Sequence, residues 1–308
     1  KLVKTVRGRN PQVQRVPAVI KFVDIAGLVK GAHRGEGLGN QFLAHIREVD
    51  LICQVVRDFE DVNVARAQGS TNPEEDIEIV DTELILKDLE TVGRRLAELE
   101  KQFRTSSAKE QKAQLAATQK VQRGLEDGKL AAGAGLDQDE RRALLDLQLL
   151  TLKPTVYVLN ISESQLNGTP ERKLPGRSVI TVCAKLEEEL GALNKDEQRE
   201  YLRQFGLQAS ALDRLITTCY QLLNLVTFFT VVGGEKVQAW PVARGTKALD
   251  AAGIVHSDFA ARFIKAEVIA WEELVNCGSW SVAKEKGKAR AEGREYEVRD
   301  GNVVEFKI

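Results

Sequence analysis

The stretch Val19-Ile-Lys-Phe-Val-Asp-Ile-Ala-Gly27 guides the interpretation of this chain. Its first residues are mostly apolar and β-branched, which predicts a buried strand over residues 19–23 that ends at Asp24. Similar runs at residues 51–56, 155–159 and 178–182 predict three more strands. Helical patterns separate these short runs, so the sequence predicts an α/β fold with a parallel sheet.

Residues 24–27 form an Asp-x-x-Gly pattern at the carboxyl end of the first predicted strand. Ligands of parallel α/β sheets bind beyond this end of the strands. An Asp in this place suits Mg²⁺ held through water, and Gly27 lets a backbone N–H approach a γ-phosphate. The pattern is common by chance, so a helix-capping Asp beside a tight turn is the alternative.

A glycine-dense stretch, residues 31–40, follows the Asp-x-x-Gly pattern and predicts a loop with free choice of backbone angles. We interpret this loop as a switch that is ordered when a γ-phosphate is present. Leu28 stands where many small GTPases carry the Gln that orients the attacking water, and an apolar side chain cannot do that. The switch residues predicted here are Leu28, Gly31, Gly35, Gly37 and Gly39.

Two later strand ends carry polar residues that point to a base-binding site. Asn160-Ile-Ser-Glu163 occupies the place of the Asn-Lys-x-Asp element of GTPases, with Ile161 for Lys and Glu163 for Asp. Both changes weaken guanine recognition, whereas a backbone N–H and C=O near Ile161 would suit adenine. Cys183-Ala184-Lys185, after the next strand, fits the Ser-Ala-Lys type of loop that lies beside the base.

The chain between the second and third predicted strands reads as a helical hairpin. Apolar residues recur in a heptad seam from Thr82 to Phe103, and a second helical stretch ends near Leu125. Residues 137–140 resemble a capping box that starts the helix returning to the sheet. From residue 223 the pattern changes to β-branched runs, which predict a hairpin over residues 225–232 and 236–242. Short strands at residues 295–298 and 303–306 around an Asp-Gly turn complete a small mixed β domain.

Charge and cysteine usage predict a cytoplasmic protein. The formal net charge is -1, the four Cys are scattered, and no apolar run approaches the roughly 20 residues of a membrane span. We therefore expect neither a membrane nor DNA as a partner. A basic stretch, residues 284–294, holds five Lys or Arg, and we expect it either to contact rRNA phosphates or to be a solvated surface.

Taken together, these motifs resemble the YchF family of Obg-like ATPases, and the resemblance covers nearly the whole chain. The matching segments are residues 22–31, 35–43, 72–79, 82–84, 152–154, 160–163, 222–225, 239–240, 253–256 and 300–301. The resemblance implies a P-loop NTPase (G) domain at residues 1–81 and 137–222. It further implies an inserted coiled-coil hairpin at residues 82–136 and a C-terminal β-grasp (TGS) domain at residues 223–308.

The resemblance also implies a Mg²⁺-dependent ATPase that binds ATP better than GTP and associates with the ribosome. Asp24 would hold the metal, and the nucleotide site would comprise Gly27, Asn160, Ile161, Glu163, Cys183, Ala184 and Lys185. The catalytic residue stays open. Where the family commonly has a His this chain has Arg66, which can stabilise charge but cannot act as a base, and His33 on the glycine-dense loop is a second candidate.

One departure from the family concerns the phosphate-binding loop. No Gly-x-x-x-x-Gly-Lys-Ser/Thr occurs in these 308 residues, and the chain contains no Met. We expect the P-loop to precede Lys1 in the intact protein, and the chain as it stands not to hydrolyse ATP. Two alternatives stay open, namely an ordinary GTPase and a ribosome- or RNA-binding module that works without nucleotide.

Overall fold

The computed structural model describes residue 2 and residues 13–25, 38–60, 72–105, 109–166, 172–232 and 235–308. The chain divides into two compact units, one formed by Lys1–Phe22 with Tyr220–Ile308 and the other by Val23–Cys219. They are called the terminal unit and the central unit below. The predicted domain boundaries near residues 81, 136 and 222 stay a prediction.

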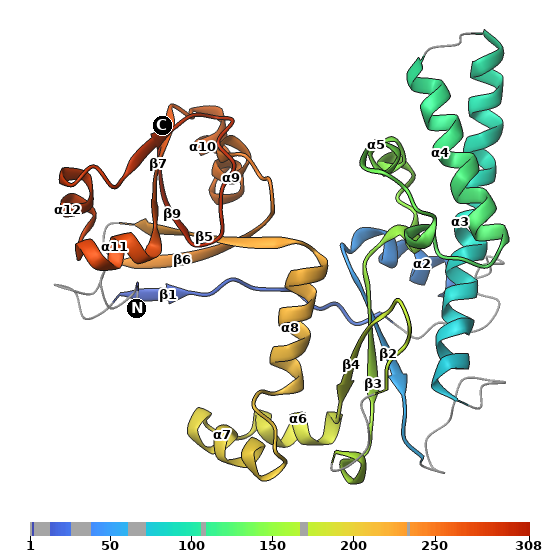
Figure 1. The fold of residues 1–308 in the computed structure, drawn as a ribbon, viewed down its shortest axis with the longest axis horizontal. Coiled ribbons are helices and arrows are strands. Elements are labelled where there is room, and N and C mark those ends of the chain that lie inside the picture. Colours follow the sequence, from blue (N-terminus) through green and yellow to red (C-terminus); the bar gives the residue numbers. More distant parts are fainter. Residues whose placement is uncertain are drawn as a thin grey trace. The chain divides into compact units, whose positions relative to one another are not determined.

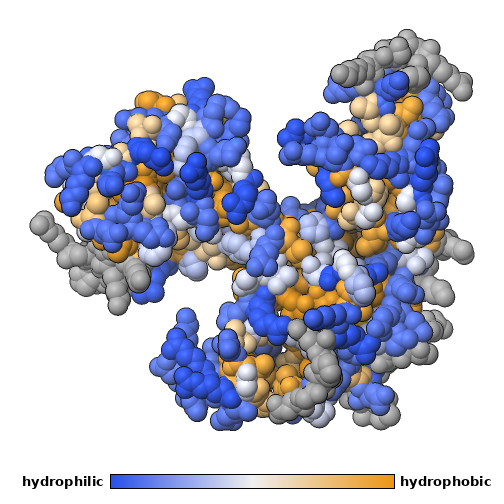
Figure 2. Space-filling model, in the orientation of Figure 1, coloured by the Kyte–Doolittle hydropathy of each residue, from blue (hydrophilic) through white to orange (hydrophobic). Residues whose placement is uncertain are grey.

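The central unit is built on a parallel sheet in the order β2-β3-β4. Its strands are β2 (Ile52–Arg57), β3 (Thr155–Asn160) and β4 (Ser178–Val182). Residues 156–159 of β3 are buried, as expected for a parallel strand that is covered on both faces. The three strands predicted from residue 51 onward are therefore confirmed. Figure 2 shows apolar surface gathered over this sheet.

The strand predicted over residues 19–23 is wrong, because these residues lie outside the regular elements. Val19, Phe22 and Val23 are 69%, 46% and 53% exposed. A strand forms only where a neighbour satisfies its backbone hydrogen bonds, and no described strand lies beside this run. The apolar pattern is present, but Asp24 does not follow a strand.

The central unit also contains helices before, between and after these strands. They are α2 (Leu38–Glu48), α3 (Pro73–Thr105), α4 (Lys109–Glu126), α5 (Gln138–Ala143), α6 (Ala184–Gly191), α7 (Lys195–Gln204) and α8 (Ala211–Leu222), the last ending in the terminal unit, with short 3-10 helices η2 (Ala131–Gly133), η3 (Leu145–Leu147), η4 (Leu150–Leu152) and η5 (Glu163–Gln165). The capping box predicted at residues 137–140 is confirmed, since the Asp137 side chain accepts from the Glu140 N–H at 2.8 Å.

Helix α3 serves both the sheet and the hairpin. Near its start, Ile77 packs with Val56 of β2 and Leu159 of β3. Farther along, from Ile85 to Leu96, α3 packs against α4, which runs beside it (Figure 1). The predicted heptad seam is therefore present from Ile85 to Leu96, whereas Thr82 at its start is exposed and the side chain of Phe103 at its end lies outside the described residues.

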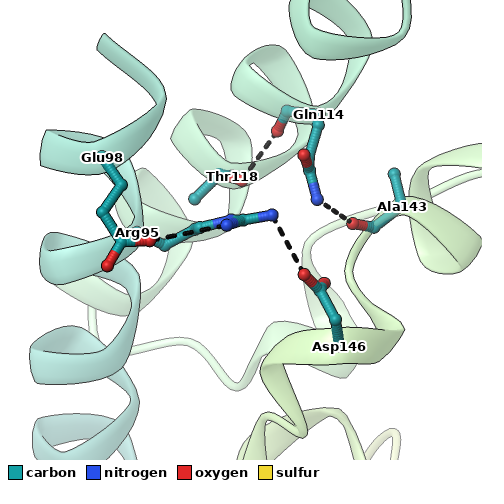
Figure 3. A network of polar contacts seen from close by, with 6 residues as sticks. All are labelled: Arg95, Glu98, Gln114, Thr118, Ala143 and Asp146. Atoms are coloured by element: carbon teal, nitrogen blue, oxygen red, sulfur yellow. Dashed lines mark hydrogen bonds and ion pairs between the residues drawn. The ribbon is translucent and has the colours of Figure 1, made fainter. Parts of the chain in front are cut away.

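Polar contacts fix the hairpin to the segment that returns to the sheet (Figure 3). Arg95 of α3 pairs with Asp146 at 3.0 Å, and Gln114 of α4 donates to the Ala143 carbonyl at 3.0 Å. Each helix of the hairpin thus has its own bond to residues 143–146, which limits rotation of one helix against the other.

A buried carboxylate holds α3 against the segment that leads into β3. Asp88 is fully buried and accepts from the N–H groups of Leu150 and Thr151 at 2.9 and 2.7 Å and from the Thr151 hydroxyl at 2.7 Å. Burial raises the pKa of the Asp88 carboxyl, and the bonds from Thr151 oppose this rise. The position of this segment therefore depends on one side chain of α3.

The carboxyl end of α2 is anchored close by. Lys153 Nζ donates to the carbonyls of Arg47 and Val49 at 3.1 and 2.6 Å, and Arg47 donates to the Thr91 hydroxyl of α3 at 3.1 Å. A cation on the last carbonyls of a helix is favourable because those carbonyls have no partner within the helix. Helix α2, which begins within the glycine-dense stretch, is thus fixed to the base of the hairpin.

The terminal unit contains a mixed sheet in the order β1-β6-β5-β9-β7-β8 among the described residues. Its elements are β1 (Gln14–Val16), β5 (Leu225–Val232), β6 (Lys236–Ala243), α9 (Ala248–Val255), α10 (Ser257–Ala261), β7 (Lys265–Ala270), α11 (Trp271–Cys277), α12 (Trp280–Glu285), β8 (Arg290–Glu292) and β9 (Asn302–Lys307). The hairpin predicted from residue 225 is confirmed by the antiparallel pairing of β5 with β6. The strand predicted at residues 295–298 is reduced to one bridge between Glu297 and Lys247.

Side chains along the strands of the terminal unit point alternately to the two faces of the sheet, and both faces are apolar. Val226 and Phe228 pack in one cluster with residues of α9, whereas Val303 belongs to a second cluster with Leu274 of α11 and Ala283 of α12. Successive side chains of a strand point to opposite faces, so an apolar run can serve both clusters. This sheet is therefore covered by helices on both faces (Figure 1).

The Asp-Gly turn before β9 closes this unit. Asp300 accepts from the Thr227 N–H at 2.8 Å, and Gly301 has a φ of 77°. A Cβ at Gly301 would lie 2.7 Å from the Trp271 ring, so only Gly fits both the backbone angle and the space. None of the described helices has the length and apolar character needed to cross a bilayer.

We predict that Asp88→Ala lowers the free energy of unfolding by about 3 kcal/mol, because the Leu150 and Thr151 donors would stay buried without an acceptor. Urea denaturation measures the loss. Asp127→Ala, at an exposed pair with Lys129, is the matched control and should change little. Equal effects of the two changes would contradict this account of Asp88.

Candidate functional site

The candidate site lies where β3 and β4 end. The parallel ladder continues one step past these strands, because the Ile161 N–H donates to the Val182 carbonyl at 2.8 Å. On the other side, the Asp58 N–H at the end of β2 donates to the Asn160 carbonyl at 2.8 Å. The loop that begins at Asn160 therefore starts from a fixed backbone position between two neighbouring strands.

The Asn160 side chain bridges the loops after β3 and β4. Its Oδ1 accepts from the Ala184 N–H at 3.1 Å. Ala184 is the first residue of α6, and the preceding Cys183 makes no side-chain cap. Asn160 therefore satisfies one of the free N–H groups at the start of this helix. Since Oδ1 is used in this way, Nδ2 is the group left to donate, and it donates to no other described residue.

Glu163 and Lys185 form the charged part of the site. Glu163 Oε2 lies 2.7 Å from Lys185 Nζ, and the two side chains are 36% and 67% exposed. The hydrogen bond to Glu163 raises the pKa of Lys185. An ion pair this exposed adds little to stability, so its chemical effect is to place one carboxylate and one ammonium beside the Asn160 loop.

Ile161 and Cys183 lie beneath this polar layer. Both are buried in one apolar cluster with Leu186, Leu190 and Leu202 of the following helices. Their side chains support the loops from below. The Ile161 N–H already donates to the Val182 carbonyl, so of the backbone groups of Ile161 itself only the carbonyl is left for an adenine contact.

Of the predicted metal and switch residues the structure describes Asp24 and Gly39, and neither belongs to this cluster. Asp24 is exposed, and its neighbour Ile25 packs with Leu43 and Ile46 of α2. Gly39 lies in the first turn of α2 and not in a loop. Among the described residues, no group of three or more His, Cys, Asp or Glu is placed to hold a metal. The remaining predicted residues lie outside the described ranges: Gly27, Leu28, Gly31, His33, Gly35, Gly37 and Arg66.

Sequence reasoning missed two residues that border the site. Gln165 contacts the backbone of both Ser162 and Asp58, and Asp58 also forms an ion pair with Arg172 at 3.3 Å. The pattern Ser-x-x-Gln at residues 162–165 is a capping signature and was the available signal. The bond from Gln165 to Asp58 spans 107 positions and leaves no local trace in the sequence.

The basic stretch at residues 284–294 is largely paired with acids. Lys284 contacts Glu267 and Glu305, and Lys288 lies 3.5 Å from Glu273. These partners reduce the positive field that a nucleic acid would meet. The structure therefore favours the solvated alternative for these side chains over an unpaired basic patch.

Comparisons with known proteins agree with this architecture. Residues 4–102 match the family MMR_HSR1, described as 50S ribosome-binding GTPase, and residues 225–308 match YchF-GTPase_C, described as a protein of unknown function (DUF933). The solved structure of the Schizosaccharomyces pombe YchF GTPase superposes with a TM-score of 0.82 at 33% identity, covering 99% of this chain and 84% of that one.

Curated relatives give the same result. A Bacillus subtilis (strain 168) protein named ribosome-binding ATPase YchF is 41% identical over 309 residues, which cover 97% of this chain and 84% of the relative. Its Escherichia coli O157:H7 namesake is 41% identical over 304 residues, covering 96% and 83%. The fold is that of a P-loop NTPase domain followed by a separate C-terminal domain, as predicted. The chain belongs to the YchF family.

Replacement of Asn160 tests its bridging bond. Asn160→Ala removes the acceptor for the Ala184 N–H and should lower the free energy of unfolding by about 1 kcal/mol. Asn160→Asp keeps an oxygen in place and should cost less. Chemical denaturation of both variants measures the difference, and a loss that is the same for Ala and Asp would show that the bond to Ala184 contributes nothing.

Proposed function

We propose that this protein binds and hydrolyses ATP with Mg²⁺ and that the Asn160 loop binds the adenine. The observation that carries the proposal is the bond from Asn160 Oδ1 to the Ala184 N–H at the carboxyl ends of β3 and β4, because it leaves Nδ2 as a donor for a purine. A donor here suits the N7 atom, which adenine and guanine share, so Asn160 contributes affinity and not selectivity.

Selectivity between the bases would come from Ile161 and Glu163. Adenine carries an amino donor at position six, where guanine carries a carbonyl, and the free Ile161 carbonyl is an acceptor that favours the amino group. Guanine recognition by a carboxylate uses both of its oxygens, and in Glu163 one oxygen is already paired with Lys185. These two features support a preference for ATP over GTP.

Magnesium would be held on the phosphate side by Asp24. Mg²⁺ keeps several waters and takes hard oxygen ligands, so one exposed carboxylate together with phosphate oxygens fits its needs. When bound, the ion would neutralise charge that develops on the phosphates. Movement of the glycine-dense loop with the γ-phosphate would then act as a switch, and its link to the hairpin base through α2 supports this role.

Titration of the full-length protein with ATP and GTP tests the assignment. We expect ATP to bind at least about tenfold more tightly, equivalent to roughly 1.4 kcal/mol. Hydrolysis should require Mg²⁺ and should be lost in Asp24→Asn. Tighter binding of GTP would support the ordinary GTPase, and binding of neither nucleotide would remove the assignment.

A variant of Glu163, in the proposed adenine site, makes this test more specific. Glu163→Asp introduces the residue that reads guanine in GTPases and shortens the side chain that reaches Lys185. It should therefore reduce the difference between the affinities for ATP and for GTP. Glu188→Asp, at an exposed position of α6, is the matched control. Replacement of Ile161 by Lys is unsuitable because it would place an ammonium group in the apolar cluster beneath the loop.

Ribosome contact is the second part of the proposal, and it rests on the names of the bacterial relatives. We expect the full-length protein to co-sediment with ribosomes more strongly when ATP is bound, with a contact that weakens as salt rises if it involves rRNA phosphates. Equal co-sedimentation of the 308-residue chain without nucleotide would favour the binding module that works without ATP. Failure of both to co-sediment would contradict this part.

A further inference from the structure

Gln165, a partly buried residue at the end of η5, contacts two separate segments of the central unit. Its Oε1 accepts from the Ser162 N–H at 2.8 Å and from the Ser162 hydroxyl at 2.7 Å. Its Nε2 donates to the Asp58 carbonyl at 3.0 Å. One side chain thus connects the Asn160 loop to the end of β2.

These contacts form a closed set of hydrogen bonds, in which Asp58 binds both the start of the loop and the Gln165 side chain that holds Ser162. The Asp58 N–H donates to the Asn160 carbonyl at 2.8 Å, and the Asp58 carbonyl accepts from Gln165, which in turn holds Ser162. The Asn160 loop is therefore tied at both its first and its third position to Asp58, the residue that follows β2. Arg172, 3.3 Å from the Asp58 carboxylate and 2.6 Å from Glu74 of α3, holds that residue in place.

The groups proposed to meet the base lie within this closed set, and of the Gln165 amide only one N–H is without a bond to the described residues. Both its amide oxygen and its amide nitrogen are engaged by protein atoms. We propose that Gln165 is a positioning residue, one that orients Asn160, the Ile161 carbonyl and Glu163 for the base without touching the nucleotide. This inference rests on the proposed function and adds to it the element that fixes the loop before ATP arrives.

A matched pair of variants separates this role from general stabilisation. Gln165→Met keeps the shape of the side chain and removes all three bonds. Gln198→Met is the control, because Gln198 is also partly buried in the central unit and donates to the carbonyls of Leu190 and Leu193 at 2.8 and 3.1 Å, away from the loop. We expect similar losses of thermal stability in the two variants.

Two measurements on the full-length protein then distinguish them. Gln165→Met should weaken ATP binding about tenfold, as displacement of a binding group by a fraction of an ångström readily does. In the protein without nucleotide it should also speed hydrogen exchange of the Ser162 amide. Gln198→Met should leave both quantities as in the wild type. If Gln165→Met does not fold, Gln165→Glu serves instead, because it keeps the acceptor for Ser162 and loses the donor to Asp58, and it should weaken ATP binding to a smaller extent.

The outcomes separate this inference from the assignment on which it rests. If the wild type does not bind ATP, the proposed function fails and this inference fails with it. If the wild type binds ATP but the Gln165 variant binds it equally well, or exchange of the Ser162 amide is unchanged, the positioning role is wrong while the ATP site stands. A loss of ATP affinity that is equal in the Gln165 and Gln198 variants also overturns the positioning role.

Discussion

The central unit depends on the buried carboxylate of Asp88. A carboxylate removed from water is costly unless donors surround it, and here three donors from Leu150 and Thr151 do so. Because these residues lie just before β3, the bond sets where that strand starts, and the ladder then carries the position to Asn160 at its end. The same side chain belongs to the helix of the hairpin, so one interaction fixes both parts of the unit.

In the candidate site, too, single polar side chains fix the backbone of segments that are distant in the sequence. Asn160 caps a helix that it does not precede in the chain, and Gln165 ties its loop to a strand from a distant part of the sequence. Each of these bonds joins backbone groups that would otherwise lack a partner. A loop held in this way loses little further freedom on binding a ligand, which lowers the entropic cost of binding.

The sequence predicted those parts of the fold that rest on local patterns. The runs of β2, β3 and β4, the heptad seam of α3 and the capping box at Asp137 all depend on neighbouring residues, and all are confirmed. The run at residues 19–23 has the same pattern but no strand beside it among the described residues, which no local rule detects. In the candidate site, the order of the motifs along the sequence predicted Asn160 and Lys185. The bond of the Ile161 N–H to Val182 and the bond of Gln165 to Asp58 join residues that are distant in the sequence, so local patterns do not predict them.

The continuity of α3 has a mechanical consequence. A helix of 33 residues is about 50 Å long at 1.5 Å per residue, and it is clamped over its first half, by the sheet near Ile77 and by Asp88 at its middle. The 17 residues beyond Asp88 extend about 26 Å, so a tilt of about 5° at that clamp would displace the far end of α3 by roughly 2 Å. The hairpin is therefore a lever, which converts a shift too small to disturb the packed base into a displacement large enough to make or break a hydrogen bond at its tip.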